Sequence, residues 1–303
     1  MAEHRFDPNF TQNVINAIGP KATPRTREVF TALFKHVHDF AREVELTMDE
    51  WQQGMQFLDE VGHIYFTSNK TRHEMHRISD VIGLESLVDE IAHTHASESG
   101  AAPTSSSILG PFWSPNAPFR ELGDSVIQDS HKGQVSYLYG KVTDMETGEP
   151  IANAIVDMWQ ASSNGKYDFQ DPDNQSPNNL RGKFRTNAEG NYYYYGLKPT
   201  AYSLPTDGPS WQMLQALDRH PMRPAHIHMT VSADGYRAVT TQIYPKDDPW
   251  LETDTVFAVK DDLVRDFVAR EGDAKAQIQM YMDFKLAPAP TNGVNGQNGA
   301  NGH

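Results

Sequence analysis

The fold of this chain is indicated by one stretch, VSYLYGKVTDMETGEPIANAIVDMW, at residues 135–159. Its first eight residues have the period of two that is typical of a half-buried strand, because alternate side chains share a face of a sheet. Residues 144–150 combine Asp, Gly and Pro as a hairpin connection does. Residues 155–159 are rich in β-branched and aromatic side chains. The stretch therefore predicts two short strands with a tight turn between them.

Further short strands are predicted at residues 192–195 and 227–231, with turn residues between them. No helical pattern alternates with these strands, so a parallel sheet with crossover helices is not indicated. Short strands at this spacing are typical of an antiparallel β-sandwich. We predict such a sandwich for residues 101–287, which makes the chain mainly β.

The N-terminal third has a different pattern, because apolar side chains recur there at spacings of three and four. Pro24 suits the first turn of one helix. Thr47 and Glu50 form a capping box at the start of a second helix. Two more helices are predicted between residues 70 and 97, which makes this part of the chain all-helical.

The domain boundaries follow from composition. A linker rich in Ser and Gly begins at residue 98 and predicts a boundary near residue 100, so residues 1–100 would form the helical domain. Residues 288–303 end in a Gly/Asn-rich run with nothing to bury. We predict that this tail is disordered.

Composition excludes several classes of function. The 303 residues include 40 Asp or Glu and 26 Lys or Arg, and the net charge of −14 repels phosphate backbones, so we expect no nucleic-acid partner. There is no cysteine, which excludes disulfides, thiolate metal sites and a cysteine nucleophile. No apolar stretch reaches the ~18 residues of a membrane-spanning helix, and the N-terminus lacks the pattern of a secretory signal. We therefore expect a cytoplasmic protein.

Three His-x-His pairs occur, at residues 36–38, 93–95 and 226–228. The first lies in a predicted helix, where residues two apart point about 200° from each other and cannot share an ion. The second falls at a predicted helix end, where the helix dipole favours positive side chains. The third lies in a predicted strand, where alternate side chains share a face with Cα atoms roughly 6.6 Å apart. His226 and His228 are therefore a candidate chelating pair, with the polar face of an exposed strand as the alternative.

Other candidate sites have weaker support. His73 and His76 lie three apart on a predicted helix, but we find no acidic residue at matching spacing to complete a ligand set. Asp171 opens a stretch similar to a calcium loop, yet its sixth position is Ser176 and its twelfth is Gly182. The chain has neither a Gly-rich phosphate loop after a strand nor a Gly-x-Ser-x-Gly motif. Nucleotide chemistry and serine hydrolysis are therefore not indicated.

The residues that complete the ligand set around His226 and His228 decide the chemistry. A carboxylate would indicate a ferrous oxygenase, a third His would indicate zinc, and phenolates would indicate ferric iron. Tyr167 and Tyr202 each lie in an irregular connection, from which a side chain can point inward. Arg223 precedes the pair by three residues, and a cation beside a metal suggests an anionic substrate or intermediate. These residues by themselves predict a metal site and leave its ion open.

A set of motifs resembles those of the intradiol ring-cleavage dioxygenases, in that family's order and spacing. They are GKY at residues 165–167, NLRG at 179–182, Tyr202 followed by PTDGP at 205–209, and RPAHIH at 223–228. The resemblance covers roughly residues 25–286. Three further motifs resemble the hydroxyquinol 1,2-dioxygenase branch more than the catechol branch: ISDVIG at 78–83, GPF at 110–112 and VFAVKD at 256–261.

The resemblance implies a non-haem centre with one Fe(3+) per subunit, held by Tyr167, Tyr202, His226 and His228. Two phenolates offset much of the ferric charge, and hard oxygen donors favour that oxidation state. The implied reaction inserts both atoms of O2 into an aromatic ortho-diol, with Tyr202 leaving the iron and taking a substrate proton. Arg223 would stabilise negative charge on the ring, and Gln242 would hydrogen-bond near the iron-bound oxygens.

The same resemblance places a substrate pocket at Asp80, Ile108, Leu109, Gly110, Pro111, Phe112, Leu204, Pro205, Arg223 and Val256. Asp80 could accept a hydrogen bond from a third ring hydroxyl, which favours hydroxyquinol (benzene-1,2,4-triol) as the substrate. Its product, 3-hydroxy-cis,cis-muconate, tautomerises to maleylacetate. Catechol, which gives cis,cis-muconate, is the alternative substrate. Arg77 departs from this branch, which tends to carry an apolar residue there, and suggests a different ring substituent.

In this family the N-terminal helices pair across a two-fold axis to form a homodimer and can enclose phospholipid. The apolar side chains of Val29, Leu33, Phe34 and Val37 would supply that surface here, although burial within one subunit would explain the same stripe. Two rival hypotheses stay open. One is a non-catalytic β-sandwich binding module, and the other is a zinc or copper site that leaves Tyr167 and Tyr202 unligated.

Overall fold

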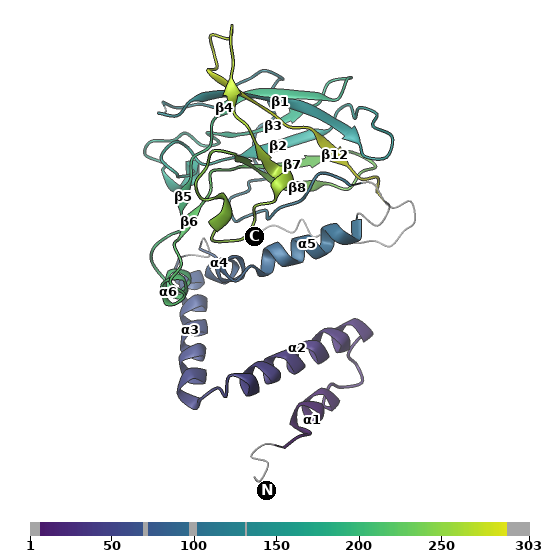
Figure 1. Ribbon diagram of the computed structural model, residues 1–303, viewed down its shortest axis with the longest axis vertical. Coiled ribbons are helices and arrows are strands. Elements are labelled where there is room, and N and C mark those ends of the chain that lie inside the picture. Colours follow the sequence, from purple (N-terminus) through teal and green to yellow (C-terminus); the bar gives the residue numbers. More distant parts are fainter. Residues whose placement is uncertain (1–6, 69–71, 97–101, 131, 290–303) are drawn as a thin grey trace. The chain divides into compact units, whose positions relative to one another are not determined.

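The computed structural model describes residues 7–68, 72–96, 102–130 and 132–289, with the side chains of residues 93–96 left out. The chain forms two compact units, one on each side of the bond between His63 and Ile64. Each unit has its own elements, which Figure 1 labels in chain order.

The first unit contains α1 (Phe10–Asn16), α2 (Pro24–Glu43) and most of α3 (Met48–Thr67). Pro24 is the first residue of α2, as predicted. The capping box before α3 is also present, because the Thr47 N–H donates to Glu50 Oε2 at 2.9 Å and the Glu50 N–H donates to Thr47 Oγ1 at 3.3 Å. Helix α1 was not predicted from the sequence.

One face of α2 is apolar and remains exposed within its unit. None of the 20 residues of α2 is buried. Leu33, Val37 and Phe40 are between 48% and 55% exposed, although their spacing is that of a packed helix face. Burial within the first unit therefore does not account for this stripe.

The second unit begins with α4 (Glu74–Val81) and α5 (Leu84–Ala96), and the β-sheets follow. The two helices lie beneath the sheets in the view of Figure 1. Hydrogen bonds hold them there: Ser86 Oγ donates to the Val256 carbonyl at 2.9 Å, and Arg219 Nη1 donates to the Val81 carbonyl at 2.7 Å. The predicted boundary near residue 100 thus falls inside the second unit.

Two five-stranded sheets form the body of this unit. The first has the order β10–β11–β1–β12, with β4 also pairing with β1, and the second has the order β3–β2–β7–β8–β9. The strands of the first sheet are β1 (Val135–Asp144), β4 (Asn191–Leu197), β10 (Val268–Ala269), β11 (Ile278–Tyr281) and β12 (Phe284–Leu286). Those of the second are β2 (Ile155–Trp159), β3 (Arg181–Arg185), β7 (Ile227–Ser232), β8 (Val239–Pro245) and β9 (Val264–Arg265).

The remaining elements are short. A two-stranded ribbon consists of β5 (Tyr202–Ser203) and β6 (Met222–Arg223), and α6 (Pro209–Ala216) lies between these strands in the sequence. Three 3₁₀ turns, η1 (Asp168–Gln170), η2 (Leu251–Thr253) and η3 (Asp261–Leu263), complete the unit.

Side chains from both sheets share one core, which confirms the predicted sandwich. Tyr194 of β4 stacks on Phe184 of β3, with ring centroids 4.8 Å apart across the two sheets. Most strand pairs are antiparallel, but β1 pairs in parallel with β11 and β12, and β8 pairs in parallel with β9. Local patterns indicate strands, whereas the direction of pairing depends on segments more than 100 residues away along the chain.

The predicted turn at residues 144–150 is present, but it does not join two paired strands. The Asp144 carboxylate accepts hydrogen bonds from the N–H groups of Glu146 and Thr147, and Thr143 pairs with Pro150. Strand β1 before the turn and β2 after it belong to different sheets. The turn therefore carries the chain from one layer of the sandwich to the other.

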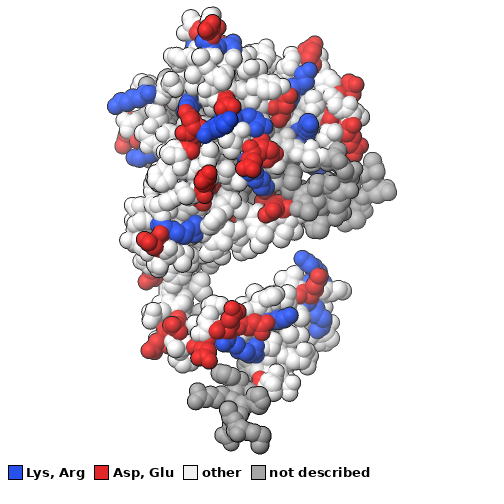
Figure 2. Space-filling model, in the orientation of Figure 1, with Lys and Arg blue, Asp and Glu red and all other residues white. Residues whose placement is uncertain are grey.

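Charged side chains of both signs are mixed on the surface. On the face shown in Figure 2, Lys and Arg side chains lie among Asp and Glu side chains, so the described residues form no large patch of one sign there. Across the described ranges no helix combines the length and apolarity needed to cross a membrane.

Residues 288 and 289 pair with residues 236 and 235, so the first two residues of the predicted tail are ordered. The rest of the tail lies outside the described residues.

Candidate active site

The four predicted ligand side chains lie together in the second unit. Consecutive ring centroids are 6.3 Å apart for Tyr167 and Tyr202, 5.4 Å for Tyr202 and His226, and 4.8 Å for His226 and His228. Tyr167 and His228 are each 1% exposed and His226 is 3% exposed, while Tyr202 is half-buried. Tyr167 lies in the loop before η1, Tyr202 begins β5, His226 directly precedes β7 and His228 lies in β7, so long-range folding brings the four side chains together.

Strand register explains how the side chains meet. In the sheet, His228 lies opposite Trp159 of β2 on one side and Gln242 of β8 on the other. In the small ribbon, Tyr202 of β5 lies opposite Arg223 of β6. Glycine allows the loops to approach, because a Cβ on Gly165, which has a φ of +76°, would lie 3.1 Å from the Cβ of Tyr202.

Both histidines are held in orientations that leave a nitrogen for a metal. His226 Nδ1 donates to the Pro224 carbonyl at 2.7 Å, so Nε2 carries the lone pair and accepts from Arg223 Nη1 at 3.3 Å. The ring of His228 stacks on Trp159, with centroids 4.9 Å apart and planes at 6°. Burial, and then the charge of Arg223, lowers the pKa of His226 to about 3. Burial, and then His226, lowers the pKa of His228, so both rings are neutral, as metal ligands must be.

The polar atoms left without partners test whether a metal fits. The hydroxyl of Tyr167 and Nδ1 of His228 are both buried and lack a hydrogen-bond partner among the described residues. Unpaired buried groups of this kind are uncommon and point to a role outside the protein's own hydrogen bonding. Burial, and then Tyr202, raises the pKa of Tyr167, so the phenol keeps its proton until a cation replaces it. Two phenols and two neutral imidazoles form a donor set that fits a ferric ion.

Arg223 is the buried cation of the site, and three groups orient it. Its Nε and Nη2 donate to the two carboxylate oxygens of Asp254 at 3.2 and 3.3 Å, and Nη2 also donates to Gln242 Oε1 at 2.9 Å. Burial alone would raise the pKa of Asp254, but the charge of Arg223 outweighs it and lowers that pKa. Gln242 Nε2 donates to the Ile108 carbonyl at 2.7 Å. Gln242 of β8 therefore links Arg223 to the segment that contains Ile108.

A cavity of about 300 Å³ opens beside these residues. Most of the predicted pocket residues line it: Asp80, Ile108, Gly110, Pro111, Phe112, Leu204, Pro205, Arg223 and Val256. Leu109 does not line the cavity and is 39% exposed, whereas Ile108 is 3% exposed. Adjacent side chains of an extended segment point to opposite sides, so only one of the two can face inward. Additional lining residues are Arg77, Gly165, Lys166, Gln170, Tyr202 and Ser203.

Comparison with known proteins agrees with this geometry. Residues 23–100 match the family model described as the catechol dioxygenase N terminus, and residues 108–288 match the model described as dioxygenase. The chain is 58% identical over 284 residues to an intradiol ring-cleavage dioxygenase of Aspergillus niger, covering 93% of this chain and 89% of that protein. This chain belongs to the intradiol ring-cleavage dioxygenases.

Two further relatives of this dioxygenase carry more specific names. A catechol 1,2-dioxygenase of Candida albicans is 40% identical, with 94% of this chain and 93% of that protein covered. The solved structure of a hydroxyquinol 1,2-dioxygenase from Pseudomonas putida superimposes with a TM-score of 0.84 at 34% identity. That comparison covers 92% of this chain and 98% of the other. The predicted fold class and enzyme class are thereby confirmed.

The dioxygenase also contains a cluster that contradicts the sequence analysis. His76 Nε2 contacts Glu85 Oε2 at 2.6 Å and lies 3.6 Å from Asp80 Oδ1. The prediction that no acid accompanies His76 is therefore wrong. Asp80 follows His76 by one helical turn, and Glu85 reaches the cluster from the next helix. Burial, and then Glu85, raises the pKa of Asp80 to about 8, while the hydrogen bond to Glu85 raises the pKa of His76.

Other residues with a role in the site were missed or left without a role. Arg181 is 2% exposed and donates from Nε to Asp168 Oδ1 at 2.8 Å and from Nη1 to the Phe112 carbonyl at 2.6 Å. It thereby fixes the two segments that flank Tyr167, whose ring centroid lies 5.7 Å from the guanidinium carbon of Arg181. Asp254 also lacked any signal in the sequence, because its partner Arg223 lies 31 residues away. The NLRG motif was the only pointer to Arg181.

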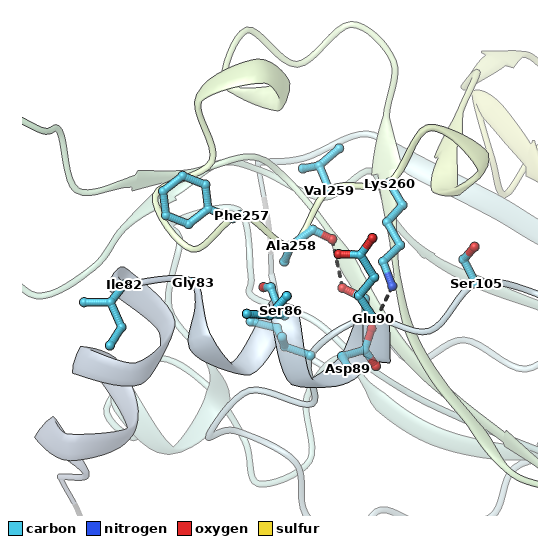
Figure 3. Close-up of a pocket in the computed structure, with 13 residues that line it drawn as sticks. Ile82, Gly83, Ser86, Asp89, Glu90, Ser105, Phe257, Ala258, Val259 and Lys260 are labelled. Carbon is cyan, nitrogen blue, oxygen red and sulfur yellow. Dashed lines mark hydrogen bonds and ion pairs between the residues drawn. The ribbon is translucent and has the colours of Figure 1, made fainter. Parts of the chain in front are cut away.

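A second cavity of this dioxygenase, about 650 Å³, lies between α5 and residues 257–260 (Figure 3). Lys260 Nζ pairs with Asp89 Oδ2 at 2.7 Å, and Ser107 Oγ donates to the Ala258 carbonyl at 3.0 Å. None of the four proposed ligand side chains lines this cavity. Its contacts instead hold the segment that carries Val256 against α5.

Proposed function

We propose that this dioxygenase cleaves hydroxyquinol between its two adjacent hydroxyl-bearing carbons, giving 3-hydroxy-cis,cis-muconate, the tautomer of maleylacetate. The observation that carries the proposal is the convergence of Tyr167, Tyr202, His226 and His228, with orphaned donor atoms, at the edge of a 300 Å³ cavity that also contains a carboxyl group. Catechol, which gives cis,cis-muconate, is the second candidate, because a catechol 1,2-dioxygenase is among the relatives.

The metal of the proposed centre is one Fe(3+) per subunit, held by the two phenol oxygens and one nitrogen from each histidine. When bound, ferric iron would supply the positive charge that makes the phenols and a bound diol acidic. The family is known to depend on non-haem iron, and the donor set described above fits that ion.

The two tyrosines differ in what they can do. Tyr167 is 1% exposed and does not line the substrate cavity, whereas Tyr202 is half-buried and lines it. A substrate hydroxyl can therefore reach Tyr202 Oη, which accepts its proton. Burial raises the pKa of Tyr202, so its phenolate is a strong base. Tyr167 remains a fixed ligand.

Arg223 and Asp80 orient the ring. Arg223 lines the cavity and is fixed by Asp254 and Gln242, so its charge is in place for negative charge that develops on the diol. Asp80 lines the same cavity, and burial, followed by Glu85, raises its pKa to about 8, which favours the protonated form. A protonated carboxyl group can both donate to and accept from a third ring hydroxyl.

The helical N-terminus supports a proposal on assembly. The exposed apolar face of α2 is the kind of surface that a second copy covers, so we propose a homodimer through the N-terminal helices, with phospholipid as a further occupant. Residues 1–100 would supply the dimerisation surface and, through Arg77 and Asp80, also part of the wall of the substrate cavity, while residues 101–287 would be the catalytic region. The cytoplasmic location stays a prediction.

A visible spectrum tests the proposed function. Purified protein reconstituted with ferric iron should show a broad phenolate charge-transfer band, which shifts when hydroxyquinol is added without oxygen and returns after oxygen is admitted. Tyr202→Phe should bind iron more weakly, and a matched Tyr195→Phe change, made at a half-buried tyrosine outside the cavity, should leave the band unchanged. A colourless protein that holds zinc or copper would refute the proposal. A protein that binds diols but never consumes oxygen would favour the binding module.

A further inference from the structure

We propose that the substrate cavity accepts aromatic ortho-diols that carry a negatively charged ring substituent, such as a carboxylate, and that Arg77 binds this substituent. The inference rests on the proposed function and deepens it, because it concerns the substrate class of the same site.

Arg77 is placed to reach a substrate. It lies one turn before Asp80 on α4, so both side chains project from the same face of the helix, and both line the cavity. The helix supplies a wall separate from the strands and loops that carry the four proposed ligands. Only 12% of the Arg77 side chain is exposed, so its charge is largely removed from solvent.

The charge of Arg77 is incompletely balanced by its neighbours. Its Nη1 pairs with Oε1 of Glu74, which is fully buried, but the same oxygen also accepts from Arg72 Nε at 2.7 Å. The other oxygen of Glu74 accepts from the N–H and the hydroxyl of Ser210 at 3.1 and 2.8 Å. One carboxylate is thus shared by two guanidinium groups.

Arg72 has a second acidic hydrogen-bond partner, whereas among the described residues Arg77 has none and feels Asp207 only through its charge. Arg72 Nη1 donates to Asp207 Oδ2 at 2.7 Å, and Arg72 Nη2 donates to the Asp207 carbonyl. Of the five N–H donors of the Arg77 guanidinium, only the one that contacts Glu74 has a hydrogen-bond partner among the described residues. Burial lowers the pKa of Arg77 despite Glu74, as expected for a cation with a deficit of negative charge.

The other groups of the cavity add to this deficit. Lys166 and Arg223 also line it, and the one acidic side chain in its lining is Asp80, whose pKa is raised by burial and then by Glu85. The wall is therefore net positive. A neutral diol would leave the remaining Arg77 donors without a charged partner, whereas a carboxylate on the ring would pair with them. A volume of about 300 Å³ has room for a single substituted ring.

The test compares two substrates of nearly equal shape, 3,4-dihydroxybenzoate and the uncharged 3,4-dihydroxybenzamide, with the iron-loaded full chain. A charge-assisted hydrogen bond is worth roughly 10- to 200-fold, so kcat/KM measured by oxygen uptake should favour the benzoate by at least ~10-fold. Arg77→Gln should remove this preference by lowering kcat/KM for the benzoate much more than for the benzamide, and Arg77→Lys should restore part of it. Calorimetry without oxygen should show the same ratios in the dissociation constants.

Arg72→Gln is the matched control, because it removes the other guanidinium bound to Glu74 but lies outside the cavity lining. It should keep a preference for the benzoate, although a smaller one, because Glu74 then pairs with Arg77 alone while the other Arg77 donors still face the cavity. Equal use of the two substrates by the wild-type protein, or an equal loss of preference in both glutamine variants, would overturn the inference. Failure to consume oxygen with hydroxyquinol and catechol would instead count against the proposed function, and the calorimetric ratio would still decide the role of Arg77.

Discussion

Replacing Tyr167 by Phe should stabilise the iron-free protein and weaken the iron-bound one. The Tyr167 ring is 1% exposed and lies 4.6 Å, centroid to centroid, from the ring of Phe112. Its hydroxyl has no hydrogen-bond partner among the described residues. An unsatisfied buried polar group costs about 1–3 kcal/mol, and Phe removes the hydroxyl without leaving a cavity around the ring. The nearby Tyr202 hydroxyl offsets part of this cost, so we expect a gain of about 1 kcal/mol.

Tyr244→Phe provides a control of opposite sign. Tyr244 is also fully buried, but its hydroxyl donates to Gln242 Oε1 at 2.9 Å. Loss of such a bond, with the acceptor left behind, costs about 0.5–1.5 kcal/mol. Without iron, Tyr167→Phe should therefore raise the free energy of unfolding, and Tyr244→Phe should lower it.

The assay is urea unfolding followed by near-ultraviolet circular dichroism, first with a chelator and then with ferric iron. In a parallel thermal unfolding experiment, a gain of ~1 kcal/mol would raise the Tm of a chain of this size by roughly 2 °C. Iron at 100 times its dissociation constant adds about 2.7 kcal/mol to the wild type, so adding iron should reverse the order of wild type and Tyr167→Phe. The reasoning would be refuted if iron-free Tyr167→Phe lost as much stability as Tyr244→Phe.

Three further predictions concern stability. Burial raises the pKa of Asp80 from its ordinary value to about 8, so the folded protein binds an extra proton between about pH 4 and 8 and loses stability as pH rises, by up to ~1.4 kcal/mol per pH unit. Asp80→Asn should therefore make the urea midpoint depend less on pH over this range, and an unchanged pH dependence would contradict the assignment. Gly140→Ala would place a Cβ 1.7 Å from the Met282 carbonyl oxygen on the crossing segment, so stability should fall by about 3 kcal/mol or more, and a Tm within 2 °C of wild type would count against the close approach. Asp254→Ala leaves the Arg223 charge buried without its carboxylate, which should cost about 3–5 kcal/mol in urea unfolding, and a wild-type midpoint would show that Arg223 finds another partner.

Local signals in the sequence were sufficient for the elements and for part of the site. The capping box at Thr47 and Glu50 formed as predicted, because it needs only residues three apart. The spacing of two that places the rings of His226 and His228 side by side, with centroids 4.8 Å apart, is equally local, although β7 itself begins at Ile227. The strands at residues 135–142, 155–159, 192–195 and 227–231 were predicted for the same reason.

Local sequence signals did not predict the contacts between residues that are far apart in the chain. Glu85 completes the cluster at His76 from a separate helix. Arg181 contacts Phe112, which lies 69 residues earlier in the chain, as well as Asp168. The turn at residues 144–150 has the sequence of a hairpin, yet the strands beside it enter different sheets because each finds its partner elsewhere.

The sequence by itself determined the class of the fold, the family and the residue types of the proposed metal site, since periodicity, capping and motif spacing are properties of neighbouring residues. The tertiary structure alone decided which groups are buried, how they are paired and what charge they carry. Arg77 shows the difference. The sequence showed an unusual residue at this position, but folding decides that Arg77 shares the Glu74 carboxylate with Arg72 and lines the cavity. Burial and pairing depend on distances in space, and these arise only when segments far apart in the chain pack against one another.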